Sequence, residues 1–178
     1  MNINAHQKLF ILGLAASLPF LTNAAMADSP AVDGSTVVSA PEKVGLDKYV
    51  GAKELSPTEL ADLLSLVGFK GKSLKLAWAI TMRESRGHPL SHNDSKYSGD
   101  NSYGLFQINM LGSLGADRRE KFGIQTNAEL FDPVTNAKAA FYMSARGTNF
   151  GSWGLGPDAY DGTASEPAVT KWLDEFPK

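Results

Sequence analysis

The chain has 178 residues, with 17 lysines and arginines against 19 aspartates and glutamates, and therefore a net charge of −2. This balance gives no support for nucleic-acid binding, because affinity for a phosphate backbone depends on an excess of positive charge. The chain has no cysteine, which excludes disulfide bridges, thiol nucleophiles and cysteine-based zinc sites, so the core alone must hold the fold together.

The first 27 residues have the pattern of a secretory signal peptide. Lys8 supplies a positive charge, residues 9–21 form an apolar run, and Ala25-Met26-Ala27 is a small-x-small cleavage site. The run is shorter than the roughly 20 apolar residues that a membrane-spanning helix needs, although an uncleaved anchor is the alternative. We therefore predict an exported protein, periplasmic or secreted, with no stable membrane anchor after cleavage.

The remainder divides into a leader and one domain. Residues 28–41 are small, polar and proline-bearing, which predicts a flexible leader. Residues 42–178 are expected to form a single domain with a core of its own. At its start, residues 42–55 are compatible with either an extended arm or a short helix.

The first clear helix begins at Ser56-Pro57-Thr58-Glu59. Ser56 is a favoured capping residue, Pro57 suits the first helical position, and Glu59 completes a capping box. Gly68 is expected to end this helix. Apolar residues at helical spacing predict its buried stripe: Leu60, Leu63, Leu64 and Val67.

A second helix is predicted from Ser73, as its cap, to Gly87, where a glycine close to a proline is a stop signal. Leu76, Ile80 and Glu84 follow one another at i, i+4 spacing, so an apolar stripe runs into a carboxylate in the last turn. Partial burial and the negative end of the helix dipole both favour a protonated carboxylic acid, which is the form that a general acid needs. The alternative is a solvated glutamate paired with a lysine or arginine.

The rest of the domain combines one long connector with short helices. Residues 88–102 are polar and turn-rich, with room for a small hairpin. Residues 103–109 are too few to distinguish a strand from the start of a helix. Further helices are predicted over residues 115–122, 127–130, 134–146 and 167–176. The fold class is therefore mostly α, with a small β-hairpin or loop region beside the helix that ends near Glu84.

Two motifs in the domain carry a family resemblance. Arg83-Glu84-Ser85 lies at the end of the second helix, and Tyr103-Gly104-Leu105-Phe106-Gln107-Ile108-Asn109 follows further along the chain. Together they resemble the lysozyme superfamily and, within it, the soluble lytic transglycosylases, which share a Glu-Ser at a helix end followed by a Gly-Leu-x-Gln-Ile segment. The resemblance covers roughly residues 55–160 and implies an α+β lysozyme-like fold.

The resemblance also implies a reaction. It is cleavage of the β-1,4 bond between N-acetylmuramic acid and N-acetylglucosamine in the glycan strands of peptidoglycan. Glu84 would protonate the departing glycosidic oxygen and then accept a proton from the muramic acid 6-hydroxyl, which closes onto the anomeric carbon as a 1,6-anhydro sugar. No cofactor is implied, and a monomer is expected.

A second carboxylate would distinguish this reaction from hydrolysis, because ordinary glycosidases use two. The resemblance implies an aspartate at the position of Ser102 in animal-type lysozymes and at the position of Asn109 in goose-type lysozymes. Both acids are missing here, which favours the single-glutamate reaction. Asp100 remains nearby as a possible second acid that positions a water, as in a muramidase. A catalytically inactive glycan-binding module is the third alternative.

Polar side chains near Glu84 are candidate substrate contacts. Gln107 and Asn109 carry amides that suit the N-acetyl and hydroxyl groups of a sugar, although buried amides also serve to tie loops to the backbone. Ser85 and Ser102 are candidates to hydrogen-bond Glu84 or the substrate.

Aromatic side chains are candidate sugar platforms. Tyr103 and Trp153 are placed to lie against sugar rings, although aromatic residues mostly pack cores. The Ala-Tyr-Asn-Ala-Gly segment of many soluble transglycosylases is absent, and the nearest stretch is residues 149–154. Which residue replaces the family's tyrosine is therefore open.

A metal site is not expected. His88, His92 and Asp94 lie in one polar loop, but their spacing matches no strong zinc signature.

Overall fold

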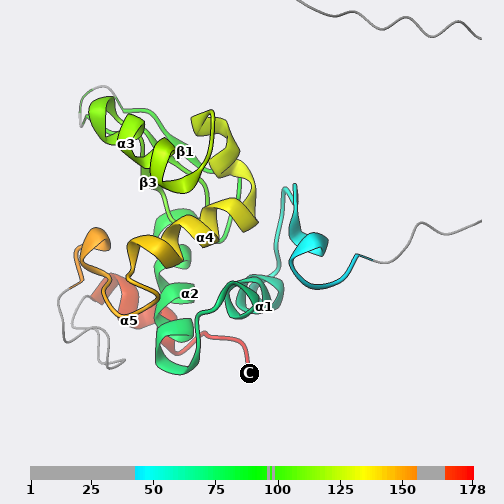
Figure 1. The fold of residues 1–178 in the computed structure, drawn as a ribbon. Helices are drawn as coiled ribbons and strands as arrows, with labels where there is room; N and C mark the ends of the chain where they lie inside the picture. Colours follow the sequence, from blue (N-terminus) through cyan, green and yellow to red (C-terminus); the bar gives the residue numbers. More distant parts are fainter. Residues whose placement is uncertain (1–42, 96, 98, 156–166) are drawn as a thin grey trace, which may run out of the picture. The chain divides into compact units, whose positions relative to one another are not determined.

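The computed structural model describes residues 43–178, apart from 96, 98 and 156–166. The predicted signal peptide (1–27) and leader (28–41) lie outside the described residues. None of the helices in the described part of the chain has the length and apolar character that a membrane crossing requires. The elements follow in this order (Figure 1): η1 (Gly45–Tyr49), α1 (Pro57–Val67), α2 (Gly71–Ser85), β1 (His92–Asn93), β2 (Ser102–Tyr103), β3 (Ile108–Asn109), α3 (Gly112–Phe122), η2 (Asn127–Phe131), α4 (Pro133–Met143), η3 (Gly151–Trp153) and α5 (Pro167–Leu173).

Helix α1 begins as its capping residues predict. The Ser56 side chain accepts a hydrogen bond from the Glu59 backbone N–H, and Glu59 Oε2 accepts one from the Ser56 N–H at 2.8 Å. The hydrogen bonds from the Ser56 hydroxyl and backbone lower the pKa of Glu59. Three of the four predicted stripe residues are buried, and the fourth, Val67, is only partly buried.

Replacing Ser56 by alanine is expected to lower the free energy of unfolding by about 1 kcal/mol, because the first turn of α1 loses its cap. The pKa of Glu59 is lower in the folded state, so the stabilisation from its carboxylate is present at neutral pH and is lost as the pH falls through that lowered pKa. Urea unfolding at neutral and acidic pH measures both effects. The exposed neighbour Thr58 provides the control, since Thr58→Ala removes no cap; equal losses in the two variants would contradict the assignment.

Helix α2 is the central element and lies between α1 and α5 (Figure 1). Every residue from Leu76 to Thr81 is buried. The helix begins two residues before the predicted cap, because Lys70 is the N-cap and the Ser73 hydroxyl bonds back to the Lys70 backbone. It also ends earlier than predicted, because Arg86 adopts a left-handed conformation with φ of 58°. Glu84 therefore lies in the last turn.

The predicted hairpin is present and extends to a third strand. The strands pair antiparallel in the order β1-β2-β3, with His92 opposite Tyr103 and Ser102 opposite Asn109. The segment 103–109 thus supplies the end of β2, a tight turn and β3. The small sheet lies beyond the C-terminal end of α2 (Figure 1), so the mostly α, lysozyme-like α+β prediction is confirmed.

The turn between β2 and β3 packs tightly against the start of α4. Gly104 has φ of 70°, and a Cβ at this position would lie 2.3 Å from both Asn136 Nδ2 and Leu130 O. Asn136 is fully buried and makes three hydrogen bonds: Oδ1 accepts from the Phe106 N–H, and Nδ2 donates to the carbonyls of Tyr103 and Leu130. One amide side chain therefore holds the turn that carries Gln107.

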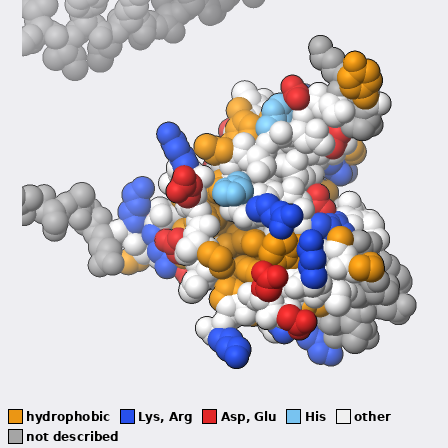
Figure 2. All heavy atoms as spheres, turned by 180° about the vertical axis from the view of Figure 1, so that it is seen from behind, with side chains coloured by type: hydrophobic (Ala, Val, Ile, Leu, Met, Phe, Trp, Pro, Cys, Tyr) orange, Lys and Arg blue, Asp and Glu red, His pale blue; other side chains and the backbone are white. Residues whose placement is uncertain are grey.

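The later helices differ from their predicted ends. Helix α4 stops at Met143 rather than 146, because Ala145 and Arg146 both have positive φ. Helix α5 ends at Leu173, with Phe176 packed beyond it against the core. On the face shown in Figure 2, acidic and basic side chains are interspersed around apolar ones, so neither sign of charge dominates it.

Candidate active site

A polar cavity of about 490 Å³ lies beside the C-terminal end of α2. The end of α2, the small sheet with its connecting loop, and η3 together form its wall. The lining residues are Arg83, Glu84, Asn93, Gly99, Asp100, Ser102, Gln107, Asn109, Ser152 and Trp153. Six of the eight side chains singled out from the sequence thus meet at one cavity, while Ser85 and Tyr103 do not line it.

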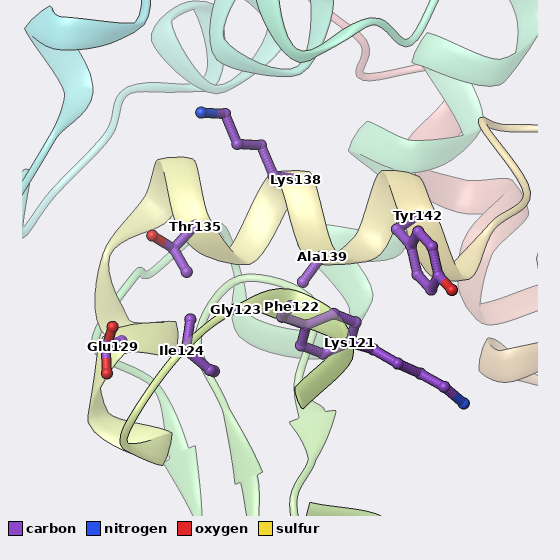
Figure 3. A pocket seen from close by; sticks show the side chains of 9 residues that line it. All are labelled: Lys121, Phe122, Gly123, Ile124, Glu129, Thr135, Lys138, Ala139 and Tyr142. Carbon is purple, nitrogen blue, oxygen red and sulfur yellow. The ribbon is translucent and has the colours of Figure 1, made fainter. Parts of the chain in front are cut away.

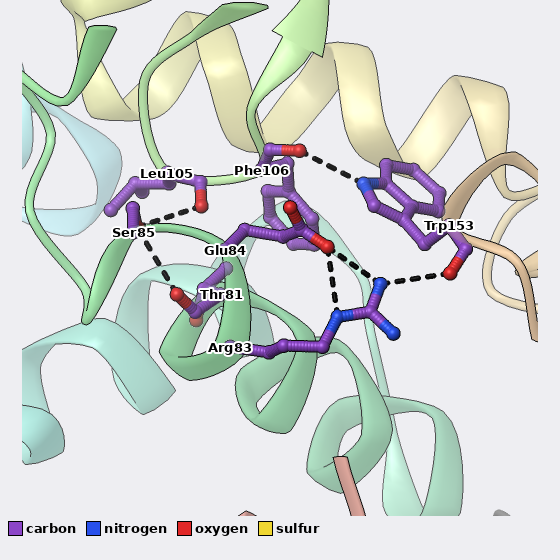
Figure 4. Close-up of polar contacts among 7 residues, drawn as sticks. All are labelled: Thr81, Arg83, Glu84, Ser85, Leu105, Phe106 and Trp153. Carbon is purple, nitrogen blue, oxygen red and sulfur yellow. Dashed lines mark hydrogen bonds and ion pairs between the residues drawn. The ribbon is translucent and has the colours of Figure 1, made fainter. Parts of the chain in front are cut away.

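Glu84 is held by its neighbour in the chain. The side chain is 24% exposed, and Oε1 accepts hydrogen bonds from Arg83 Nε at 2.9 Å and Nη2 at 2.6 Å (Figure 4). Arg83 Nη2 also donates to the Trp153 carbonyl oxygen at 2.8 Å. Within the described residues, Glu84 Oε2 has no hydrogen-bond partner. The carboxylate is therefore oriented through one oxygen and keeps the other available.

The sequence left two alternatives for Glu84: a partly buried neutral acid, or a glutamate paired with a lysine or arginine. The structure shows the pairing, with Arg83, and it also shows partial burial of the Glu84 side chain at the cavity wall. Arg83 bridges α2 and η3, so the guanidinium has a fixed place, and a charge-assisted hydrogen bond to a fixed donor restricts the carboxylate rotamer. The pairing with Arg83 thus orients the Glu84 carboxylate at the cavity wall.

Asp100 is the second carboxylate at the cavity, and both of its oxygens are engaged within the sheet region. Oδ2 accepts from Asn93 Nδ2 at 2.6 Å, and Oδ1 accepts from the Ser102 hydroxyl. These contacts join β1, β2 and the loop between them. Asp100 therefore stabilises the hairpin by joining its two strands through hydrogen bonds.

Each of the two predicted amides bonds to the backbone through one of its polar atoms. Gln107 Nε2 donates to the carbonyls of Ser91 and Gly104, at 3.1 and 3.0 Å, which closes the turn. Asn109 Oδ1 accepts from the Leu111 N–H at 2.9 Å. Among the described residues, Gln107 Oε1 and Asn109 Nδ2 have no partner. One acceptor and one donor are thus left for a ligand. Each amide can therefore anchor its turn to the backbone and still bind a ligand through its other polar atom.

Ser85 is placed away from the cavity. Its hydroxyl is buried and lies 2.8 Å from the Leu105 carbonyl oxygen and 3.1 Å from that of Thr81 (Figure 4). It follows Glu84 on the helix, so its side chain projects about 100° further round the axis, toward the core. Its contacts join α2 to the turn before β3, rather than supporting Glu84 or substrate directly.

The two predicted aromatic platforms have other partners. Tyr103 follows Ser102 in β2, and successive strand residues point to opposite faces. Its ring accordingly packs on His92 and Phe131, with centroids 4.4 and 5.3 Å away. Trp153 lines the cavity but is only 8% exposed, and its Nε1 donates to the Phe106 carbonyl at 2.9 Å. Trp153 thus forms part of the wall and offers little of its ring for stacking.

Four lining residues were not identified as site candidates from the sequence: Arg83, Asn93, Gly99 and Ser152. Arg83 belongs to the quoted motif, but its second contact is with the Trp153 carbonyl, 70 residues away. Asn93 ends β1 and Ser152 lies in η3, and no local sequence pattern distinguishes either of them. Asn93 reaches the cavity because the hairpin register sets it opposite Ser102. The predicted hairpin in residues 88–102 is the one sequence feature from which this position could have been inferred.

Comparisons with curated proteins and with solved structures give no match. A family model described as a lysozyme-like domain matches residues 61–155, which is more than half of the chain and includes every residue that lines the polar cavity. This lysozyme-like family is one of glycosidases and transglycosylases that act on peptidoglycan outside the cytoplasm. The chain belongs to this family of lysozyme-like domains.

Proposed function

We propose that the chain is a lytic transglycosylase that cleaves the bond between N-acetylmuramic acid and N-acetylglucosamine. Glu84 protonates the glycosidic oxygen as the bond to the anomeric carbon breaks. The resulting carboxylate takes the proton of the muramic acid 6-hydroxyl, whose oxygen bonds to the anomeric carbon. The products are a 1,6-anhydro end and a free 4-hydroxyl, with no water consumed and the Glu84 proton restored.

One observation carries this proposal over hydrolysis. Two carboxylates border the cavity, but both oxygens of Asp100 accept hydrogen bonds from Asn93 and Ser102, while Glu84 keeps Oε2 without a partner in the described residues. A hydrolytic base must accept a proton from water, which is harder for a carboxylate already bonded at both oxygens. This favours a reaction in which a single glutamate acts and the substrate supplies the nucleophile.

The remaining polar atoms support glycan binding in the same cavity. The amide oxygen of Gln107 suits an N–H or hydroxyl donor of the sugar, and the amide nitrogen of Asn109 suits an acetamido carbonyl. We assign Ser102 to holding Asp100 and Trp153 to forming the wall. The inactive glycan-binding alternative shares these contacts, and a cleavage assay separates it from the enzyme.

The product mass tests the mechanism. Digestion of purified peptidoglycan sacculi is expected to release anhydro-muropeptides, each one water lighter than the hydrolytic product. Digestion in ¹⁸O-labelled water is expected to leave the new muramic ends unlabelled. Labelled, hydrated ends would contradict the transglycosylase proposal and support a muramidase, and no release at all would support the binding module.

The variant Asp100→Asn separates the two enzymatic candidates. For a transglycosylase we expect less than about tenfold loss of rate with unchanged anhydro products, because the asparagine retains an acceptor oxygen for the hairpin. A muramidase that uses Asp100 to activate water would lose about 10²–10⁴-fold. The rate of fragment release, measured beside Asp94→Asn from the same loop, decides between them.

We further propose that residues 42–178 are the catalytic domain of an exported protein. On this proposal residues 1–27 are removed as a signal peptide, and 28–41 form the leader of the mature chain. The pattern of Lys8, the apolar run and Ala25-Met26-Ala27 supports it.

A further inference from the structure

A second hollow lies on the outer side of α4, with no lining residue in common with the polar cavity. It has a volume of about 370 Å³, and a neighbouring hollow of about 380 Å³ shares Lys138 and Tyr142 with it. The two together are called the α4 groove. Their lining residues are Lys121, Phe122, Gly123, Ile124, Glu129, Thr135, Lys138, Ala139, Phe141, Tyr142, Ala145 and Arg146.

The floor of the α4 groove is apolar and its rim is aromatic. Figure 3 shows Ile124 and Phe122 below the α4 ribbon, with Ala139 pointing toward them. Tyr142 is 61% exposed, and its ring meets that of Phe122 edge to face with centroids 6.2 Å apart. A ligand that fits here needs small apolar groups for the floor.

The rim of the α4 groove carries exposed cations and one carboxylate. Lys121 is paired with Asp117 at 2.8 Å, whereas Lys138 and Arg146 are exposed and have no ion pair within the described residues. The carboxylate of Glu129 is held by the backbone N–H groups of Gln125 and Thr126, which lower its pKa. Glu129 therefore keeps its negative charge, but its Oε1 is taken up by the backbone. Lys138 and Arg146 remain as two cations without an ion pair in the described residues, beside an apolar floor.

We propose that the α4 groove binds the stem peptide of peptidoglycan, which carries both carboxylates and alanine methyl groups. Lys138 and Arg146 would pair with the carboxylates, and the methyl groups would cover the floor formed by Phe122, Ile124 and Ala139. A phosphodiester polymer would satisfy the cations but leave this floor exposed to water, so charge and shape together favour the peptide. This inference rests on the proposed function, because it takes peptidoglycan as the substrate.

The test measures binding without cleavage. The full chain carrying Glu84→Gln is titrated by NMR with a synthetic stem tetrapeptide that has no sugar attached. Lys138→Gln/Arg146→Gln is expected to weaken binding about three- to tenfold, as the loss of two exposed ion pairs predicts. Tyr142→Ala is expected to weaken it as well. The matched control is Lys53→Gln/Lys72→Gln, which removes two exposed lysines outside the groove and should leave the affinity within twofold of the parent.

Each outcome has a definite meaning. Shifts confined to α4 and the end of α3, lost in the Lys138/Arg146 variant and kept in the lysine control, support the proposal. No binding, equal binding by both double variants, or preference for a soluble polyphosphate over the peptide would overturn it. The titration measures peptide binding without turnover, so it is independent of the cleavage assay. If the peptide fails to bind while the parent chain still releases fragments, this inference alone is overturned. If the peptide binds although Glu84 proves not to be the acid, the proposed role of Glu84 alone is overturned.

Discussion

Replacing Glu84 by glutamine is expected to reduce the release of soluble fragments from purified peptidoglycan by about 10³-fold, because glutamine has no proton to donate to the glycosidic oxygen and cannot serve as base. The side chain keeps its size, and its amide oxygen can still accept from Arg83, which now makes two bonds to Glu84 Oε1. Binding to sacculi should therefore persist while turnover is lost.

The matched control is Glu54→Gln, which changes an exposed glutamate outside the cavity and should retain full activity. Fragment release is followed by chromatography of the soluble muropeptides, and binding by co-sedimentation with sacculi. If Glu84→Gln released fragments at the parent rate, the assignment of the acid would be wrong. If it lost binding together with release, Glu84 would be acting through the shape of the cavity and not as the acid.

Replacing Asn136 by alanine is expected to lower the free energy of unfolding by about 3–5 kcal/mol. The variant leaves three backbone groups without partners: the N–H of Phe106 and the carbonyls of Tyr103 and Leu130. Burying such groups unpaired costs roughly 1–3 kcal/mol each, with part recovered by relaxation. The turn that carries Gln107 should loosen at the same time, so fragment release should fall as well.

Urea unfolding of the full chain measures this effect. Gln125→Ala provides the control, because the Gln125 side chain is exposed. In the part of the chain that the structure describes, the hydrogen bond of Gln125 to Glu129 comes from its backbone N–H, which alanine keeps. The control should stay within about 0.5 kcal/mol of the parent. A loss below about 1 kcal/mol for Asn136→Ala would mean that the turn between β2 and β3 is held by other contacts.

Local signals in the sequence predicted most helices but located their ends poorly. The capping box of Ser56 and Glu59 lies within one turn, so it could be recognised from spacing alone, and α1 begins as predicted. Helix α4 stops early because Ala145 and Arg146 take up left-handed conformations. Nothing in those two residue types favours that conformation, and the preferences of single residues are weak beside tertiary packing.

The roles of individual site residues depended even more on packing. Ser85 and Tyr103 belong to the motifs that carry the family resemblance, yet one bonds to the Leu105 carbonyl and the other packs on His92. Sequence proximity to Glu84 or Gln107 could not show this, because adjacent residues on a helix or strand point in different directions.

The amino-acid sequence by itself determined that an apolar helix ends in a carboxylate and that a polar hairpin and an amide-bearing segment follow, since caps and periodicity act over a few residues. Only the tertiary structure decided which of those side chains share a cavity, because the deciding contacts join distant parts of the chain. Arg83 reaches the Trp153 carbonyl across 70 residues, and Asn136 holds the Phe106 N–H across 30. Such contacts form only when the buried faces of the helices pack together, and no local pattern encodes them.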